Sequence, residues 1–246
     1  MKIIVATLFS LSLMVHADTI AFPNSLSAKT LSDRYGPELA SFEKATSERY
    51  RMTIYNPSRP AETRTAAEQG LVVTSPARVI DSINEGLVPV GYHDGFTKMV
   101  LVQRAFSDSD SSCLRIARLP KISTMGWLEP YLLKESQLVE MCDVQALNMV
   151  NGLRLLKTNQ ADLVVAGFNT YQRFAANYGG HYTILASVMS PTFVFMTTLN
   201  QQAKWVERFE KIEAAGVTAP NGNPVRVWNL AILKRFEKFS QISVSS

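Results

Sequence analysis

The stretch KISTMGWLEPYLL (residues 121–133) is predicted to join a strand to a helix. It follows a strand-like run, LRIARLP (114–120), and the apolar residues after Trp127 take up helical spacing. Ser123, Thr124 and Gly126 therefore lie where a helix begins. Hydroxyls at such a place often cap the helix, but the same loop offers backbone N–H groups and the positive helix end to an anion. The pattern predicts either an N-cap or an anion site.

Strands and helices alternate on both sides of this stretch. Strands are predicted at 18–23, 51–56 and 71–75, with helical segments between them. The rhythm breaks at AFSDSDSSC (105–113), which is mostly Ser and Asp, and then begins again. Such alternation predicts an α/β protein whose mostly parallel sheets carry helices on both faces.

The break predicts two lobes, the second inserted into the first. We expect residues 18–104 and 190–246 to form the first lobe, and residues 105–189 the second. Two connecting segments, TKMVLVQR (97–104) and PTFVFMTTL (191–199), would then act as a hinge. A hinged pair of lobes encloses a cleft.

The loops that follow the predicted strands are the expected walls of that cleft, because open α/β sheets bind ligands beyond the carboxyl ends of their strands. These loops supply small hydroxyl and amide side chains and no acid. Besides the junction residues, they contribute Asn24, Thr74, Ser75 and Asn169. Uncharged donors of this kind predict a small anionic ligand.

Residues 1–17, MKIIVATLFSLSLMVHA, predict a cleavable signal peptide. Lys2 precedes an apolar run, and small residues stand at Val15 and Ala17. The run is too short to span a bilayer comfortably, and no second long apolar stretch follows it. We therefore expect export into a bacterial periplasm, with the mature chain not embedded in the membrane.

The composition fits a globular protein. Apolar residues make up 46% of the 246 residues, and the formal charge of +4 comes without a block of basic residues. That charge pattern argues against a nucleic-acid partner.

The reactive side chains do not predict a metal site, a cofactor or catalysis. Cys113 and Cys142 form either one disulfide or two separate buried thiols, since geometry decides between them. Neither has a histidine nearby in sequence, and the strand-end loops hold no carboxylate pair. Ser75 and Ser123 also lack a neighbouring base, so we expect no cofactor and no catalysis.

The junction resembles a known family. The segment S-T-M-G-W-L-E-P is similar to the Ser-Thr-Ser-Gly-aromatic-Leu-x-Pro element of the periplasmic phosphonate/phosphite-binding proteins. These are substrate-binding components of ABC importers with the type II periplasmic-binding-protein fold. The residues on the pattern are Ser123, Thr124, Gly126, Trp127, Leu128 and Pro130. The order of elements matches over essentially the whole mature chain.

The resemblance implies a ligand site. Ser123 and Thr124 would donate hydroxyls to the ligand oxygens and Gly126 a backbone N–H, while Thr74 and Ser75 would face them from the other lobe. Met125 departs from the family by replacing the third hydroxyl with an adaptable apolar side chain. A ligand with a smaller charge, or an anion with an apolar tail, would suit Met125 and Trp127.

Two functions remain open at this stage. The first is a receptor that delivers a phosphonate-, phosphite- or phosphate-like ligand to an ABC permease. The second is a ligand-sensing adaptor that docks on a membrane sensor kinase or cyclic-nucleotide signalling enzyme. In both, ligand contacts would shift an equilibrium between open and closed lobes, and the membrane partner distinguishes them.

Overall fold

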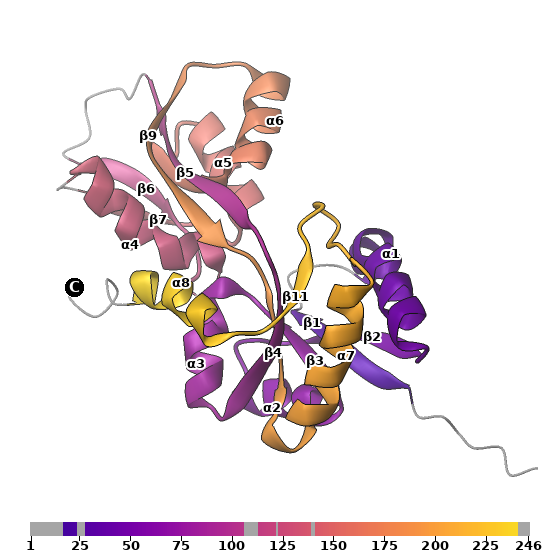
Figure 1. Ribbon diagram of the computed structural model, residues 1–246. Coiled ribbons are helices and arrows are strands. Elements are labelled where there is room, and N and C mark those ends of the chain that lie inside the picture. Colours follow the sequence, from indigo (N-terminus) through magenta and orange to yellow (C-terminus); the bar gives the residue numbers. More distant parts are fainter. Residues whose placement is uncertain (1–16, 24–27, 106–112, 122, 139–140, 241–246) are drawn as a thin grey trace, which may run out of the picture.

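The structure is a computed structural model that describes residues 17–23, 28–105, 113–121, 123–138 and 141–240 (Figure 1). The predicted signal peptide lies outside the described residues up to residue 16. The described chain forms two lobes, each with a mixed sheet flanked by helices. The prediction of a two-lobed α/β fold is confirmed.

The first lobe is built on a six-stranded sheet in the order β11-β4-β10-β3-β1-β2. Neighbours β1, β2 and β3 are parallel, whereas β10 and β11 pair antiparallel with β4. The strands are β1 (Asp18–Pro23), β2 (Tyr50–Tyr55), β3 (Gly70–Thr74), β4 (Leu87–His93), β10 (Val194–Thr198) and β11 (Val225–Val227). The helices are α1 (Ala28–Thr46), α2 (Pro60–Glu68), η1 (Pro76–Arg78), α3 (Val79–Asn84), η2 (Leu199–Gln201), α7 (Gln202–Ala214) and α8 (Leu230–Ser240).

The second lobe has a five-stranded sheet in the order β7-β6-β8-β5-β9. Strands β6, β7 and β8 are parallel neighbours, and β5 runs antiparallel to β8 and β9. The strands are β5 (Phe96–Arg104), β6 (Leu114–Arg118), β7 (Met141–Gln145), β8 (Leu163–Gly167) and β9 (Tyr182–Pro191). The helices are α4 (Thr124–Ser136), α5 (Met149–Lys157) and α6 (Phe168–Tyr178).

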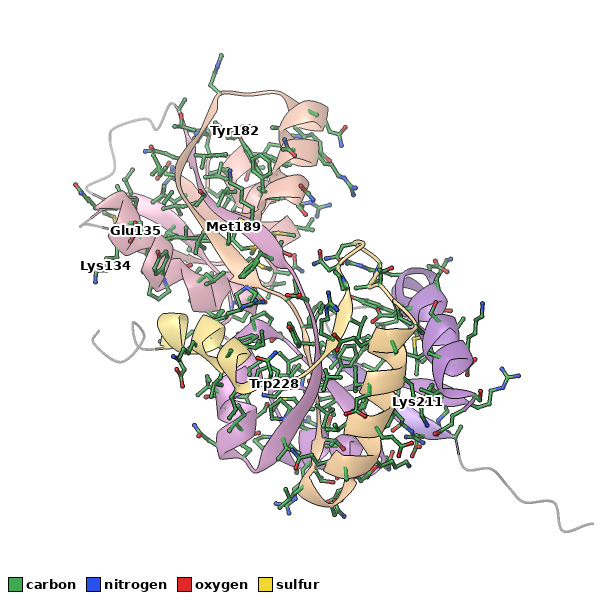
Figure 2. The ribbon with its side chains drawn as sticks, in the orientation of Figure 1. Lys134, Glu135, Tyr182, Met189, Lys211 and Trp228 are labelled. Carbon is green, nitrogen blue, oxygen red and sulfur yellow. A yellow bond between two sulfur atoms is a disulfide. The ribbon has the colours of Figure 1, made fainter. Side chains whose placement is uncertain are left out.

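Both sheets are buried on two faces, which explains the continuous apolar runs in the sequence. In β1, Ile20 and Phe22 pack with residues of α1 and α7, whereas Ala21 faces the opposite cluster. In β8, successive residues likewise alternate between two apolar clusters. Trp228, which Figure 2 labels in the first lobe, packs between Tyr92 and Phe236. Its contacts join the C-terminal helix to the sheet.

Strand β5 corrects the expected boundary between the lobes. The sequence predicts that residues 97–104 belong to the first lobe as a connecting segment, but β5 pairs with β8 and β9 in the second sheet. The chain therefore crosses before β5 rather than after it, and returns between β9 and β10. The sheets are mixed because these crossing strands enter each of them antiparallel to a neighbour.

The two crossing segments form one antiparallel ribbon. Tyr92 pairs with Val194 in the first sheet, and Phe96 pairs with Pro191 in the second. Between them the backbone N–H of His93 donates to the Phe193 carbonyl at 3.1 Å. This ribbon passes through both lobes and fixes where they meet (Figure 1).

Polar contacts reinforce the ribbon at the junction. The Thr192 hydroxyl donates to the carbonyls of His93 and Gly95. Asp94 accepts a hydrogen bond from Arg235 of α8 at 3.2 Å, and α8 contacts both α3 of the first lobe and α4 of the second. Elements from the end of the chain thus hold the first crossing in place.

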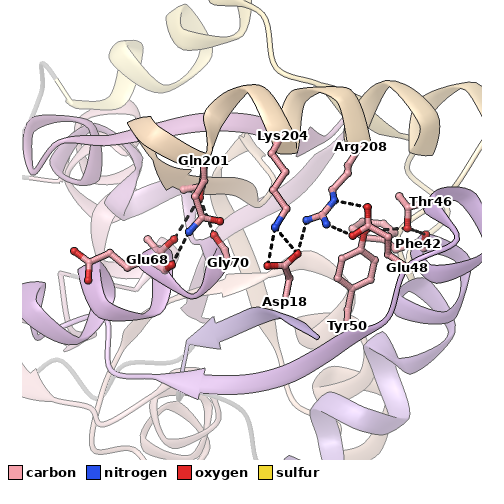
Figure 3. Close-up of polar contacts among 12 residues, drawn as sticks. Asp18, Phe42, Thr46, Glu48, Tyr50, Glu68, Gly70, Gln201, Lys204 and Arg208 are labelled. Atoms are coloured by element: carbon pink, nitrogen blue, oxygen red, sulfur yellow. Dashed lines mark hydrogen bonds and ion pairs between the residues drawn. The ribbon is translucent and has the colours of Figure 1, made fainter. Parts of the chain in front are cut away.

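An ion-pair network ties α7 to the start of β1 (Figure 3). Lys204 and Arg208 both lie 2.7 Å from an Asp18 carboxylate oxygen, and Arg208 also pairs with Glu48. Burial alone would raise the pKa of Asp18, but the hydrogen bonds and charges of Arg208 and Lys204 bring it below its ordinary value. This contribution to stability is therefore present above the ordinary aspartate pKa and is lost as the pH falls through the lowered one.

Cys113 and Cys142 are joined in a disulfide. Cys142 lies in β7, paired with Arg115 of β6, and the two Cα atoms are 5.7 Å apart. The bridge therefore connects neighbouring strands of the second sheet. Of the two arrangements left open by the sequence, the structure has the disulfide.

Replacing both cysteines by serine is expected to lower the free energy of unfolding by about 3–4 kcal/mol. The bridge spans a sequence separation of 29 residues, and its loss gives the unfolded chain more conformational entropy. Urea unfolding with and without a thiol reductant would measure the effect. The double serine variant should not respond to reductant, and an unresponsive wild type would contradict the prediction.

Candidate functional site

A cavity of about 230 Å³ lies at the junction and is lined by both lobes. The first lobe contributes Arg34, Tyr35, Pro76, His93, Ala219, Pro220 and Asn221. The second lobe contributes Thr97, Met99, Thr124, Met125, Met149, Gly167 and Thr170, and the returning crossing supplies Ser190, Pro191, Thr192 and Phe193. Such a cavity fits the cleft expected between hinged lobes.

Three helices of the second lobe begin at the cavity. Thr124 and Met149 are the first residues of α4 and α5, and Gly167 and Thr170 lie at the start of α6. Each helix follows a parallel strand, so their N-termini gather at one edge of the sheet. The partial positive charges of helix N-termini favour an anion in this space.

The strand-to-helix junction at residues 121–133 has two roles. Ser123 caps α4: its hydroxyl oxygen accepts from the Gly126 N–H at 3.1 Å and donates to the Pro120 carbonyl at 2.7 Å. Thr124 and Met125, the next two residues, line the cavity. In this structure the cap uses the Ser123 hydroxyl, and Ser123 is not among the residues that line the cavity. Contacts of Ser123 and Thr124 with a ligand stay a prediction.

Gly126 is required by packing rather than by approach to the cavity. A Cβ atom there would lie 2.3 Å from the Pro120 carbonyl oxygen, and the Gly126 N–H is already bonded to Ser123. Trp127 donates its backbone N–H to the Ser123 carbonyl at 2.9 Å and packs in the second-lobe core. Neither residue is among those that line the cavity.

The other predicted contact residues that the structure describes are not among those that line the cavity. Thr74 is 1% exposed at the end of β3, and Ser75 precedes η1, whose Pro76 lines the cavity instead. Asn169 is exposed on α6, one residue before the lining Thr170. Asn24 lies outside the described residues.

The charged part of the site comes from α1 and was missed by the sequence analysis. Arg34 and Tyr35 line the cavity, with the guanidinium carbon 5.5 Å from the Tyr35 ring centre. Burial raises the pKa of Tyr35 above its usual value; the charge of Arg34 opposes this rise, and Glu38 adds to it. No acidic residue is found on the described wall of the cavity.

A buried histidine–carboxylate pair stands behind that face. His93 Nε2 lies 2.8 Å from Glu38 Oε1, with His93 4% exposed and Glu38 6% exposed. A sequence signal for it existed: Leu31, Tyr35, Glu38 and Phe42 share one buried stripe of α1. An acidic residue at a core position of an amphipathic helix indicates a buried partner.

The described residues hold neither a metal-binding cluster nor a membrane-spanning helix. No group of three or more His, Cys, Asp or Glu side chains is placed to hold a metal ion there. Within the same ranges, no helix is both long enough and apolar enough to cross a membrane.

Comparison with known proteins gives the fold a name. No protein-family model matches the sequence, and no curated protein matches it. Solved structures do match: XAC2383 from Xanthomonas citri, bound to ATP, has a TM-score of 0.70 at 11% identity over 92% of this chain and 96% of its own. This chain has the two-lobed periplasmic binding protein fold.

Two further structures show the spread of proteins that share this fold. PhnD1 from Prochlorococcus marinus, in complex with methylphosphonate, gives a TM-score of 0.67 at 10% identity over 93% of this chain and 97% of its own. The VFT2 domain of Bordetella pertussis BvgS gives 0.55 at 15% identity over 91% and 93%. At these identities the likeness establishes the fold alone.

Ser123→Ala is expected to lower the free energy of unfolding of the ligand-free protein by about 1 kcal/mol, because α4 loses its N-cap. Ser123→Asp should retain most of the stability, since aspartate also caps helices. Thr124→Val is the matched control: it removes a hydroxyl at the adjacent cavity-lining position and should change stability less. Thermal unfolding would measure all three, and wild-type stability of Ser123→Ala would contradict the capping role.

Proposed function

We propose that this chain is an exported ligand-binding protein that closes its lobes around a small organic anion and delivers it to an ABC importer. The observation that carries the proposal is a cavity lined from both lobes at the crossing of the chain. A ligand there would contact both halves at once. Such contacts favour a closed state over an open one.

The lining supports an anion that also carries an apolar group. Arg34 supplies positive charge, and the starts of α4, α5 and α6 add the positive ends of three helices. Met99, Met125 and Met149 form a flexible apolar wall on the second-lobe side. An alkylphosphonate or similar organic anion fits this combination better than inorganic phosphate. The methylphosphonate complex of PhnD1, which shares the fold, supports the same ligand class.

Export to a periplasm agrees with two features of the chain. The sequence begins with a predicted signal peptide. The disulfide between Cys113 and Cys142 is of a kind that persists in oxidising compartments. We therefore place the proposed binding function in the periplasm.

Alkylphosphonates are expected to raise the melting temperature more than phosphate or phosphite does. A ligand at one hundred times its Kd stabilises the folded state by about 2.7 kcal/mol, which corresponds to about 5 °C or more for a chain of this size. A thermal-shift screen over these compounds, alkanesulfonates, amino acids and polyamines would test the ligand class. A shift with amino acids or polyamines alone would rule out the anionic ligand and leave a binding protein.

Two arginine variants would locate the anion. Arg34→Gln should weaken binding of the best alkylphosphonate by about tenfold or more, as expected when a charged partner is lost. Arg64→Gln is the control, because Arg64 is exposed on α2 and pairs with Glu68. Equal affinities for the two variants would remove Arg34 from the site.

A signalling adaptor is the second candidate. The BvgS VFT2 domain shares the fold, and Leu147 and Val150 are exposed beside the cavity-lining Met149, with Leu147 83% exposed. Movement of Met149 on ligand binding would alter this apolar surface. Leu147→Asp should then abolish a ligand-dependent signal without reducing uptake of the ligand by cells, whereas an importer component should show the loss in uptake.

A further inference from the structure

The His93–Glu38 pair at the junction has polar atoms that its own hydrogen bond does not use. His93 ends β4 at the point where the chain leaves the first lobe, and it is one of the residues that line the cavity. Glu38 holds Nε2 of that ring, while the second carboxylate oxygen of Glu38 is buried without a hydrogen-bond partner in the described structure. A buried carboxylate satisfied at one oxygen only favours a positive charge beside it. The ring of His93 is the group in hydrogen-bond contact with that carboxylate.

The contact with Glu38 fixes which ring nitrogen is left for a ligand. His93 Nε2 and Glu38 Oε1 share one hydrogen bond. A carboxylate only accepts hydrogen bonds, so with Glu38 as a carboxylate Nε2 is the donor. Nδ1 makes no hydrogen bond with the part of the chain that the structure describes. A neutral His93 therefore presents an acceptor at Nδ1, whereas a protonated His93 presents a donor.

The ring is held in one orientation. The backbone of His93 is hydrogen-bonded to Thr192 and Phe193 of the returning crossing. The rings of Phe193 and Phe195 meet the imidazole edge-on, with centres 6.2 Å and 5.1 Å away. Since these contacts come from the ribbon that links the lobes, the position of Nδ1 is tied to the junction itself.

The charges that face His93 come mainly from one helix. On α1 they are Glu38, Arg34 and Tyr35. Asp94, the next residue in the chain, is engaged by Arg226 and Arg235. The crossing residues Thr192, Phe193 and Phe195 carry no titratable group, and neither do the second-lobe residues on the described wall.

We propose that His93 binds the anionic group of the ligand as an imidazolium, so that ligand binding takes up one proton. An anion needs a donor, and Nδ1 becomes a donor only on protonation. The proton comes from solvent and stays on Nδ1, between the ring and the ligand, while Glu38 remains ionised and positions the ring. The anionic group then lies against Arg34 and His93 of the first lobe, away from the Ser123 turn. This inference rests on the proposed binding of an organic anion.

The pH dependence follows from that proton. Binding is strongest where His93 is already protonated, and it weakens as the pH rises, because binding must then take up a proton from solvent. Over that range the affinity falls by up to about tenfold for each pH unit. Histidine is the side chain that changes charge between about pH 5 and pH 8.

Calorimetry with ethanesulfonate would test the proposal, because the charge of that probe is constant across the range. Titrations between about pH 5.5 and about pH 8.5, in two buffers of different ionisation enthalpy, give the affinity and the number of protons taken up. We expect uptake approaching one proton per ligand at the alkaline end. His93→Gln should bind at least about tenfold more weakly at low pH, with no proton uptake.

Two variants complete the design. Glu38→Gln removes the charge that holds the imidazolium and should reduce proton uptake while leaving Arg34 in place. His181→Gln is the matched control, because His181 is exposed at the start of β9 in the second lobe, away from the cavity wall. It should behave as wild type. Circular dichroism would establish that each variant is folded, and the buffer dependence of the wild type tests the proposal even if His93→Gln fails to fold.

The outcomes separate this inference from the proposed function. Binding of ethanesulfonate without proton uptake, and unchanged in His93→Gln, overturns the role of His93 and leaves an anion-binding protein. Failure of ethanesulfonate, methylphosphonate and phosphate to bind the wild type at every pH overturns both.

Discussion

The two-stranded ribbon that crosses between the lobes is the constraint on which the rest of the molecule depends. It consists of the β4–β5 and β9–β10 segments, paired in both sheets and bonded at the junction through Thr192. Gly95 lies close to Asn223 there: a Cβ atom at residue 95 would lie 2.0 Å from the Asn223 amide nitrogen, so that side chain would have to move. Because the ribbon continues from one sheet into the other, any change in the angle between the lobes must bend these few residues. The cavity lies where that bend would occur.

At the start of a helix, capping and ligand binding compete for the same side-chain hydroxyls. A hydroxyl at the start of a helix serves either the helix or a ligand, and at Ser123 the helix takes it. The positive end of α4 still faces the cavity, through Thr124 and Met125. The second lobe therefore lines the cavity with helix N-termini, three methionines and the threonines Thr97, Thr124 and Thr170.

The charged side chain at the cavity comes from the first lobe. Arg34, Tyr35 and Glu38 lie within about one turn of α1, and Glu38 bonds to His93 of β4. An anion at this place would contact the helix that covers the first sheet and the crossing that carries the second lobe. Ligand binding and lobe geometry would then be coupled through one side chain, because His93 belongs to the ribbon.

The sequence by itself determined the α/β rhythm, the presence of two lobes and the strand ends at which a ligand would lie. Those features depend on local periodicity and on apolar runs such as Leu71–Thr74, which show directly in the order of residues. Only the tertiary structure decided that β5 joins the second sheet, that Cys113 meets Cys142, that the Ser123 hydroxyl caps α4 and that His93 meets Glu38. Each of these pairs residues far apart in the chain or chooses between two partners for one group. Such choices are made by the packing of whole elements, because hydrogen bonds and buried charges are satisfied by whatever the completed fold brings within reach.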